Sequence, residues 1–376
     1  MRNKTLKAVT ILVGATIGAG IYGIPYAINQ VGFIAGLFYL LIIGLIIHLL
    51  HLLYGEVILR TKGEHQLAGY GEIYLGKAGK ILGITSLFTG IYGALLAYTI
   101  KTGEFVALIT NQPHPVLFSL LFFFLASVVI FIGYKTVSVM NVVLFFLMVG
   151  LIVFISLIGL PRLSFSNIGA QSLGVSGIFL PYGVILFALS GSAAVPEAEK
   201  TLREEPKSLE KALFWGTIIP IVIYLLFSLI IIGICGQKTS TDAITGLKYF
   251  LPGWVVNLGA GLGIITMSTA FLSLGYILKK VWQWDFGLSR TMAFILAVFP
   301  ALFLFLFGSK NFLGVLDFAG ALTGGLTGIL IILLFMKAKK FGQRQPAYSL
   351  SIPPVLLWTL FGVFTLGLLF PFLTTR

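Results

Sequence analysis

Long apolar runs, separated by short polar segments, cover almost all of this 376-residue chain. Most of the runs reach the roughly 20 residues that an α-helix needs to cross a bilayer. The pattern predicts an all-α polytopic membrane protein that forms a single domain, 1–376. Its eleven transmembrane helices are expected at about residues 6–29, 32–59, 81–110, 115–133, 137–160, 176–197, 211–235, 250–280, 288–308, 311–336 and 352–373.

The positive charges alternate from one connection to the next. If the N-terminus is cytoplasmic, the inside segments carry 19 Lys and Arg and the outside segments carry five. Because cytoplasmic loops hold such an excess, we expect a multi-pass protein of the cytoplasmic membrane with its N-terminus inside and its C-terminus external. This topology also accounts for the net charge of +13, so we predict the lipid bilayer as surroundings and no nucleic acid as partner.

The first apolar run contains residues that disfavour a plain membrane helix. Between Gly14 and Pro25 lie Gly18, Gly20 and Gly23. Glycine uncovers the backbone and proline removes a hydrogen-bond donor, and in lipid such a break persists only where protein or a watery cavity satisfies it. A helix broken at mid-membrane indicates the binding site of a transporter. The alternative is that the glycines only allow another helix to pack closely.

The sixth run repeats this pattern. Gly191 and Pro196 have the same spacing as Gly20 and Pro25, on a helix of opposite orientation. Two such breaks, five spans apart, indicate inverted repeats. We expect a 5+5 arrangement with broken helices 1 and 6, a first repeat at 1–160, a second at 165–337, and an appended eleventh helix at 350–376.

Each break would expose the ends of two half-helices. The half-helix that begins near Ile21 presents free N–H groups, which suit a carboxylate. The halves that end near 15–17 and 188–190 present free carbonyls, which suit an ammonium group or a metal cation. An amino acid is the simplest ligand that carries both charges.

Three further segments extend the pattern. Gly14–Tyr26 followed by Gln30–Phe33, Leu53–Val57 and Leu313–Ala321 resemble the first, second and tenth helices of the amino acid/auxin permease family and of the bacterial hydroxy/aromatic amino acid permeases. Gly191 with Glu197–Lys200 resembles instead the sixth helix of the wider amino acid–polyamine–organocation superfamily. The resemblance implies the fold of the bacterial leucine transporter, with alternating access around the two broken helices.

The resemblance also implies roles for individual residues. Tyr98 would close on the substrate carboxylate, with Tyr92 as the alternative, and either could instead serve packing. Phe187 and Tyr22 would shape the side-chain pocket. The backbone at the breaks would bind the substrate, with N–H groups from Ala19, Gly20 and Ile21 facing the carboxylate and carbonyls of Leu189 and Ser190, beside Gly191, facing the ammonium group.

A sodium site is implied by the hydroxyl pair in the eighth span. Ser268 and Thr269, next to Ile265, would bind Na⁺ together with the carbonyls of Gly14 and Ile17, because hard oxygen ligands suit this ion. The alternative is that both hydroxyls bond carbonyls of their own helix. Proton-coupled relatives can place a lysine in the fifth helix, and residues 137–160 contain none, which favours sodium.

Ionisable residues within the spans are candidates for function because burying charge is costly. Lys101, Glu104 and Asp317 are candidates for a gate or a proton site, although Lys101 and Glu104 could simply pair with each other. His48 and His51 could bind protons near neutral pH or be structural.

We therefore predict a secondary active transporter that moves a neutral amino acid by Na⁺- or H⁺-coupled symport. The alternatives are an amino acid exchanger, a polyamine-type permease, or a membrane sensor that binds an amino acid without moving it. No Ser/His/Asp, paired-Asp or HExxH arrangement is present, so we expect no enzyme activity and no cofactor beyond the coupling ion. A monomer is compatible with the sequence.

Overall fold

The computed structural model describes residues 3–133, 180–308 and 310–374, and between the first two ranges residues 143, 146, 147, 149, 150, 152–154 and 156–169. Regular structure in these residues is helical throughout. In this described part, eight helical segments are long and apolar enough to cross a membrane, and the bent pair at the N-terminus makes a ninth. The expected all-α membrane fold is confirmed, while part of the expected fifth span, 137–160, lies outside the described residues.

The first span is broken, as its glycines predict. Helix α1, Asn3–Thr16, and helix α2, Gly20–Val31, are bent by 59° relative to each other. Pro25 lies inside α2, where the missing N–H weakens the helix further. The break therefore lies at residues 17–19, between two half-helices.

Helix α3, Phe33–Arg60, is followed by α4, Leu67–Thr110, and α5, Pro115–Ile132. Helix α4 begins well before the expected third span, 81–110. It changes direction at Gly76, where φ is +67°, a value that glycine adopts without strain. The polar segment before the span is thus helical, and it folds back against the span, because a Cβ on Gly83 would lie 2.7 Å from the Cα of Ala68.

The sixth span is also broken. Helix α8, Leu180–Leu189, ends before Ser190, and a short 3₁₀ turn, η3 (Ser192–Ala194), leads into α9, Val195–Thr201. Pro196 lies in the first turn of α9, where no backbone N–H is needed. The short helices η1, Leu160–Arg162, and α7, Ser166–Gly169, precede this span.

The remaining helices follow the expected order. The helix α14 corresponds to the expected eleventh span. The bounds of the other elements are α10, Ser208–Cys235; η4, Gly236–Lys238; η5, Thr245–Tyr249; α11, Gly253–Trp284; α12, Arg290–Phe307; α13, Phe312–Phe341; and α14, Pro354–Thr374.

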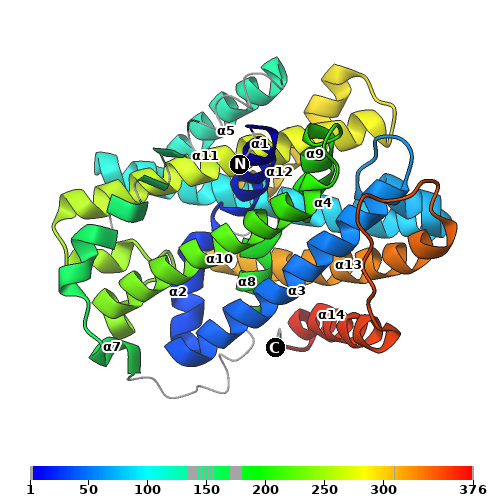
Figure 1. Ribbon diagram of the computed structural model, residues 1–376. Coiled ribbons are helices and arrows are strands. Elements are labelled where there is room, and N and C mark those ends of the chain that lie inside the picture. Colours follow the sequence, from blue (N-terminus) through cyan, green and yellow to red (C-terminus); the bar gives the residue numbers. More distant parts are fainter. Residues whose placement is uncertain are drawn as a thin grey trace.

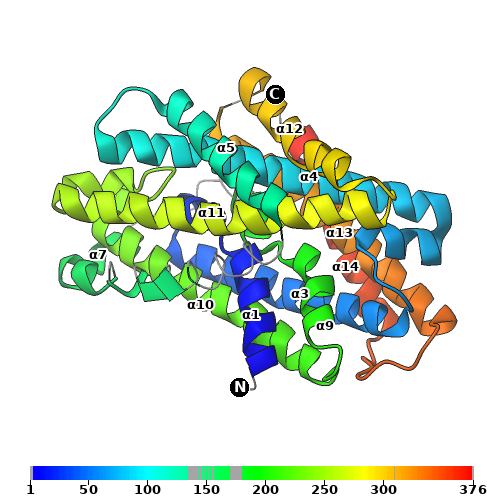
Figure 2. The same ribbon diagram turned by 90° about the horizontal axis from the view of Figure 1, so that it is seen from above.

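The long helices α4, α11 and α13 run across the whole molecule, and α4 packs against both of the others (Figure 1). Helix α8 packs against α2 and α13, so both broken spans contact each other inside the bundle. Helix α1 lies beside α9 and α10 (Figure 2). The two breaks therefore lie among helices from both halves of the chain.

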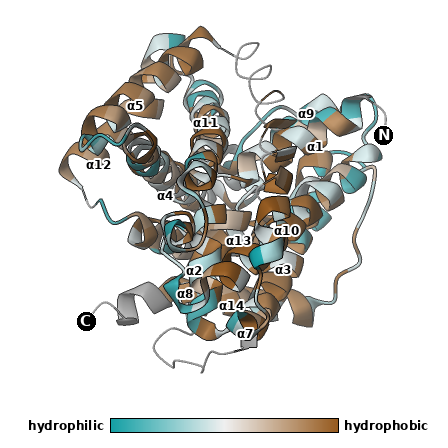
Figure 3. Ribbon diagram, turned by 90° about the vertical axis from the view of Figure 1, so that its left-hand side faces the viewer, coloured by the Kyte–Doolittle hydropathy of each residue, from teal (hydrophilic) through white to brown (hydrophobic). Residues whose placement is uncertain are grey.

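The outer surface is apolar along the helices at the edge of the bundle (Figure 3). Large exposed side chains include Leu45 on α3, Leu125 on α5, and Phe303 and Phe307 on α12. A water-soluble domain would bury most of such residues, whereas lipid solvates them. This surface agrees with a membrane-embedded bundle.

Candidate functional site: the two helix breaks

The two breaks touch each other. A Cβ atom on Gly20 would lie 2.5 Å from the Cα of Ala188, so only glycine allows this approach of α2 to α8. A Cβ on Gly191 would lie 2.4 Å from the hydroxyl oxygen of Thr16, the last residue of α1. The glycines selected from the sequence thus join the two broken spans.

A second glycine contact joins the sixth span to α13. A Cβ on Gly320 would lie 2.0 Å from the carbonyl oxygen of Gly183, and a Cβ on Gly183 would lie equally close to a carboxylate oxygen of Asp317. Both glycines are fully enclosed by backbone and side chains of the neighbouring helix. The α8–α13 contact is therefore also backbone against backbone.

Tyr224 on α10 holds the carbonyl ends of both broken helices. Its hydroxyl lies 3.0 Å from the Thr16 carbonyl oxygen and 2.8 Å from the Ala188 carbonyl oxygen, so its single hydrogen is shared between the two acceptors. The ring is fully buried. Tyr224 is not among the residues predicted from the sequence. The sequence places this tyrosine in an apolar helix. A buried tyrosine hydroxyl usually needs a hydrogen-bond partner, so its position could have marked it as a candidate.

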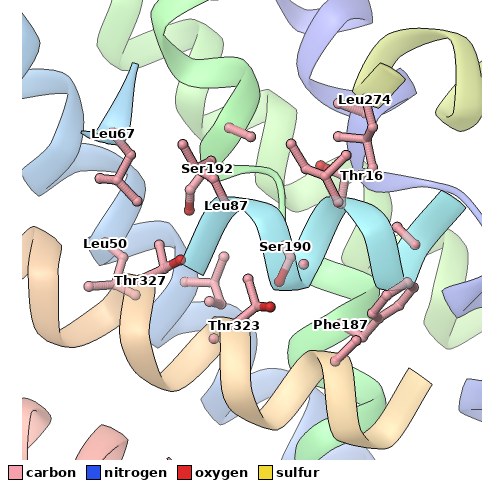
Figure 4. Close-up of a pocket in the computed structure, with 18 of the residues that line it drawn as sticks. Thr16, Leu50, Leu67, Leu87, Phe187, Ser190, Ser192, Leu274, Thr323 and Thr327 are labelled. Atoms are coloured by element: carbon pink, nitrogen blue, oxygen red, sulfur yellow. The ribbon is translucent and has the colours of Figure 1, made fainter. Parts of the chain in front are cut away.

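A central cavity lies against both breaks. Figure 4 shows Thr16 from α1 and Phe187, Ser190 and Ser192 from the sixth span around it, with Thr323 and Thr327 from α13. The cavity continues between α3, α4 and α13 toward the end of the bundle where α3 ends and α4 begins. The lining residues are Ala15, Thr16, Ile47, Leu50, Tyr54, Leu67, Leu87, Gly90, Ile91, Ala94, Tyr98, Phe187, Ser190, Ser192, Ala193, Leu274, Ala319, Thr323, Gly324 and Thr327.

Of the predicted substrate residues, Tyr98, Phe187 and Ser190 line the central cavity. Tyr98 also faces the first break, because a Cβ on Gly18 would lie 2.6 Å from its hydroxyl oxygen. The alternative, Tyr92, donates to the carbonyl oxygen of Leu296 and does not line this cavity. The structure therefore favours the position of Tyr98.

The other predicted substrate residues lie beside the central cavity or away from it. Ala19 and Ile21 are fully buried at the first break, and Leu189 is buried at the second. Tyr22 points away from the central cavity toward α11, where its hydroxyl donates to the carbonyl oxygen of Gly259 at 3.3 Å. Its ring packs against Phe105. Tyr22 thus belongs to the packing between α2, α4 and α11 in this conformation.

Two of the sodium candidates, Gly14 and Thr269, meet where α1 packs against α11. A Cβ on Gly14 would contact the methyl group of Thr269 at 3.5 Å. The hydroxyls of Ser268 and Thr269 donate to the carbonyls of Ile264 and Ile265 on their own helix, at 2.6 and 3.0 Å. Both hydroxyl hydrogens are therefore used within α11. The lone pairs of the two hydroxyl oxygens could still coordinate a cation.

The gate candidates line a second, polar cavity at the opposite end of α4, formed by Lys101, Glu104, Leu180, Thr241, Lys310, Asn311, Phe312, Leu313, Gly314 and Asp317. Lys101 forms ion pairs with Glu104 and with Asp242, the latter at 3.3 Å. It pairs with these two acids rather than with Asp317. Asp242, in the connection between α10 and α11, was not identified from the sequence.

Asp242 is held as a carboxylate. Burial raises its pKa, but Lys101 and hydrogen bonds from Thr245 and Ser240 outweigh burial and hold the pKa of Asp242 below its usual value. The short loop before η5 is thus fixed to α4 by a charged contact.

Comparison with known proteins identifies the class to which this arrangement belongs. The model of the tryptophan/tyrosine permease family matches residues 1–369. The chain belongs to this family. Tyrosine-specific transport system 1 of Haemophilus influenzae is 25% identical over 371 residues, which cover 92% of this chain and 90% of the relative. Tyrosine-specific transport system 2 of the same organism is 25% identical over 368 residues, which cover 90% of this chain and 89% of the relative.

Two solved transporters share the fold of this permease. MhsT in complex with L-phenylalanine aligns with a TM-score of 0.72 at 15% identity, over 99% of this chain and 98% of MhsT. Mhp1, a nucleobase-cation-symport-1 family transporter, aligns with a TM-score of 0.62 at 13% identity, over 98% and 87%. The expected leucine-transporter-like fold with broken helices 1 and 6 is confirmed, and the permease is a multi-pass membrane transport protein rather than an enzyme.

Proposed function

We propose that this permease is a secondary active transporter that moves a neutral amino acid across the cytoplasmic membrane by alternating access. The observation that carries the proposal is the meeting of two helix breaks beside the central cavity. The tyrosine specificity named for two relatives makes aromatic amino acids the first substrates to test.

In this proposal the backbone at the breaks binds the common part of the amino acid. The N–H groups of residues 19–21 face the carboxylate, at the positive end of α2, and the carbonyls of Leu189 and Ser190 face the ammonium group. Tyr98 contacts the carboxylate from α4. Phe187 lies at the wall of the central cavity and contacts the substrate side chain.

A cation gradient drives the cycle. Na⁺ would be held by carbonyls of Gly14 and Ile17 with the oxygens of Ser268 and Thr269 near Ile265, and H⁺ is the alternative coupling ion. The contact of α1 with α11 at Gly14 and Thr269 supports the sodium position, because it brings one residue of each proposed ligand set together.

The polar cavity forms the external gate in this proposal. The positive-inside distribution supports a cytoplasmic N-terminus, and with this orientation the polar cavity lies at the external face. Lys101 with Glu104 and Asp242 closes this face, and Asp317 lies at its floor beside α8. The central cavity extends toward the cytoplasmic face. The two inverted repeats, 1–160 and 165–337, move relative to each other around the breaks.

Uptake by purified protein in liposomes tests the proposal. L-Tyrosine, L-phenylalanine, L-tryptophan, L-glutamine and a polyamine are offered with sodium and pH gradients imposed separately. We expect accumulation of an aromatic amino acid driven by one of the gradients. Exchange against internal substrate without accumulation would indicate an exchanger, polyamine uptake a polyamine-type permease, and binding without any flux a sensor; each of these results contradicts the proposal.

A further inference from the structure

Thr323 on α13 places a hydroxyl at the wall of the central cavity (Figure 4). Threonines in membrane helices commonly donate to the carbonyl oxygen four residues earlier, as Thr16 and Thr217 do at 2.8 and 2.9 Å. The Oγ1 atom of Thr323 is buried and has no hydrogen-bond partner in the described part of the chain. A buried polar atom without a partner is costly, so a ligand that supplies one gains affinity here.

The neighbouring hydroxyls are already bonded to each other. The Oγ atom of Ser86 on α4 lies 2.5 Å from the Oγ1 atom of Thr327 and 3.3 Å from the carbonyl oxygen of Thr323. These distances allow Thr327 to donate to Ser86 and Ser86 to donate to that carbonyl, so both hydroxyl hydrogens have an acceptor. The Thr323 hydroxyl stays outside this chain of bonds and is able both to donate and to accept.

A glycine of α4 makes room for the Thr323 side chain. A Cβ on Gly90 would lie 2.8 Å from the Oγ1 atom of Thr323 and 2.5 Å from its methyl carbon. Gly90 lines the central cavity as well. The Thr323 side chain is therefore held directly against the α4 backbone at the edge of the cavity, where any larger residue than glycine would displace it.

Thr323 lies where the side chain of a bound amino acid would end. The proposed function places that side chain against Phe187, and a Cβ on Gly320, one turn before Thr323, would lie 2.8 Å from the Cβ of Phe187. On α4, Gly90 is eight residues before Tyr98, about 12 Å along the helix axis. The Tyr98 ring leans toward Gly90, because helical side chains tilt toward the N-terminus of their helix. The remaining distance is comparable to the length of a tyrosine.

The wall between the breaks and Thr323 is mostly apolar. On α4 it consists of Leu87, Ile91 and Ala94 beside Gly90. Such a wall suits an apolar ring, whereas the hydroxyl at its end suits a group that forms hydrogen bonds. A phenol combines both properties, because it has an apolar ring and an O–H that donates and accepts.

A second unpaired hydroxyl lines the central cavity. The Tyr54 hydroxyl on α3 is buried and has no partner among the described residues. Its ring packs against Tyr70 in the first turns of α4, with 5.8 Å between the ring centroids. Tyr54 thus lies at the end of the cavity where α4 begins, and Thr323 is the unpaired hydroxyl next to the helix turn that meets Phe187.

We propose that the Thr323 hydroxyl binds the phenol hydroxyl of the substrate and thereby selects tyrosine over phenylalanine. The inference rests on the proposed function and specifies the substrate side chain. Phenylalanine fills the same space and excludes water from Thr323 without offering it a partner. A site built around a substrate hydroxyl discriminates against the analogue that lacks it for this reason.

The test measures the affinities of the purified protein for L-tyrosine and L-phenylalanine. We expect the wild type to bind tyrosine about tenfold more tightly or better. Thr323→Val keeps the shape of the side chain without its hydroxyl, so the affinity for tyrosine should fall about tenfold while that for phenylalanine does not fall. Thr323→Ser keeps the hydroxyl and should keep the preference. Ser127→Ala is the matched control, because it removes a buried hydroxyl on α5 that has no partner among the described residues and does not line the central cavity.

An equal loss of affinity for both amino acids in Thr323→Val would overturn the contact, because Thr323 would then act on the shape of the cavity alone. Loss of the preference in Tyr54→Phe, with the preference intact in Thr323→Val, would assign the phenol to Tyr54 instead. A further ligand, 4-fluoro-L-phenylalanine, covers the case in which Thr323→Val does not fold. It has nearly the size of tyrosine but no O–H, so the wild type should bind it like phenylalanine, and binding as tight as that of tyrosine would overturn the proposal.

These results are separate from the proposed function. Transport of tyrosine and phenylalanine without a preference would reject the role of Thr323 and leave the proposed function intact. Absence of any amino acid transport would contradict the proposed function itself.

Discussion

The hydroxyl of Tyr224 donates to the carbonyl oxygen of Ala188 at 2.8 Å. The same hydroxyl reaches the last carbonyl of α1, so one side chain of α10 connects the ends of both broken helices. These carbonyls have no partner within a helix at a break, and burial without a partner would be costly. Tyr224 thus stabilises the conformation in which the two breaks touch.

We expect Tyr224→Phe to reduce transport. Leaving a buried carbonyl without a donor costs about 1–3 kcal/mol, which would lower the initial rate of uptake by about fivefold to a hundredfold. The measurement is tyrosine uptake in liposomes at matched protein content. Tyr182→Phe is the control, because the buried Tyr182 hydroxyl has no partner among the described residues. Equal rates in both variants would show that the bridge of Tyr224 is unimportant.

Gly20→Ala should destabilise the protein and abolish uptake. The new methyl group would lie 2.5 Å from the Cα of Ala188, and overpacking of this kind typically costs about 1–3 kcal/mol. We expect a lower thermal midpoint in detergent and loss of tyrosine binding. Gly261→Ala on α11 is the control, because its Cβ would meet open space. An unchanged midpoint and uptake in Gly20→Ala would contradict the close contact of α2 with α8.

Asp242→Asn should open the polar cavity. The substitution removes the charge that pairs with Lys101 from the α10–α11 connection. Opening can be measured with the variant Leu316→Cys in a Cys235→Ala background, through the reaction of the new cysteine with a maleimide. Leu316 is buried on α13 next to Gly23. We expect labelling to accelerate severalfold in Asp242→Asn. The control is Lys238→Gln, in the same connection, which should leave the rate unchanged.

The same assay has a defined pH dependence. Because the pKa of Asp242 is depressed in the folded protein, its pairing contributes stability above the usual aspartate pKa and is lost only as the pH falls through the lower folded value. The reactive species is the thiolate, so the labelling rate is divided by that of a fully exposed cysteine at the same pH. This ratio should be constant between pH 5 and pH 8 in the parent protein. A rise of the ratio as the pH falls within this window would contradict the charged contact as the closing element.

Sodium dependence of uptake is expected to rest on Ser268 and Thr269. Replacing both with alanine removes the two hydroxyl oxygens of the proposed sodium site, so stimulation by a sodium gradient should disappear at fixed pH. Thr359→Ala on α14 removes a hydroxyl that also bonds its own helix, at 3.0 Å, far along the chain from both breaks, and should have no effect. Sodium stimulation that survives the double substitution would reject this ion site.

The helix breaks could be located from the sequence because their causes are local. Gly18, Gly20 and Pro25 weaken the first span wherever the rest of the chain lies, and Gly191 and Pro196 do the same for the sixth. Their repetition at equal spacing indicated the inverted repeat, and the fold of the known transporters bears this out. Hydropathy and the backbone-breaking residues thus predicted the spans, the breaks and the inverted repeat, and the family resemblance added the leucine-transporter-like fold.

The partners of individual side chains could not be found in this way. Tyr224 bonds residues 208 and 36 positions away, and His51 meets Thr217 across 166 positions. Such contacts depend on which face of one helix meets another. The same reason explains Tyr22, which the sequence places near the pocket but which the rotation of α2 turns toward Gly259. The hydropathy of a membrane helix says little about how the helix is rotated about its own axis.

The contacts of Gly20 with Ala188 and of Gly320 with Gly183 share one mechanical property. At these two points the helices touch through backbone and Cβ atoms. Such atoms have no rotamers to change when one helix shifts along another. The glycines that bring the broken spans together therefore also allow α8 to shift against α2 and α13 at these points without rearranging side chains there.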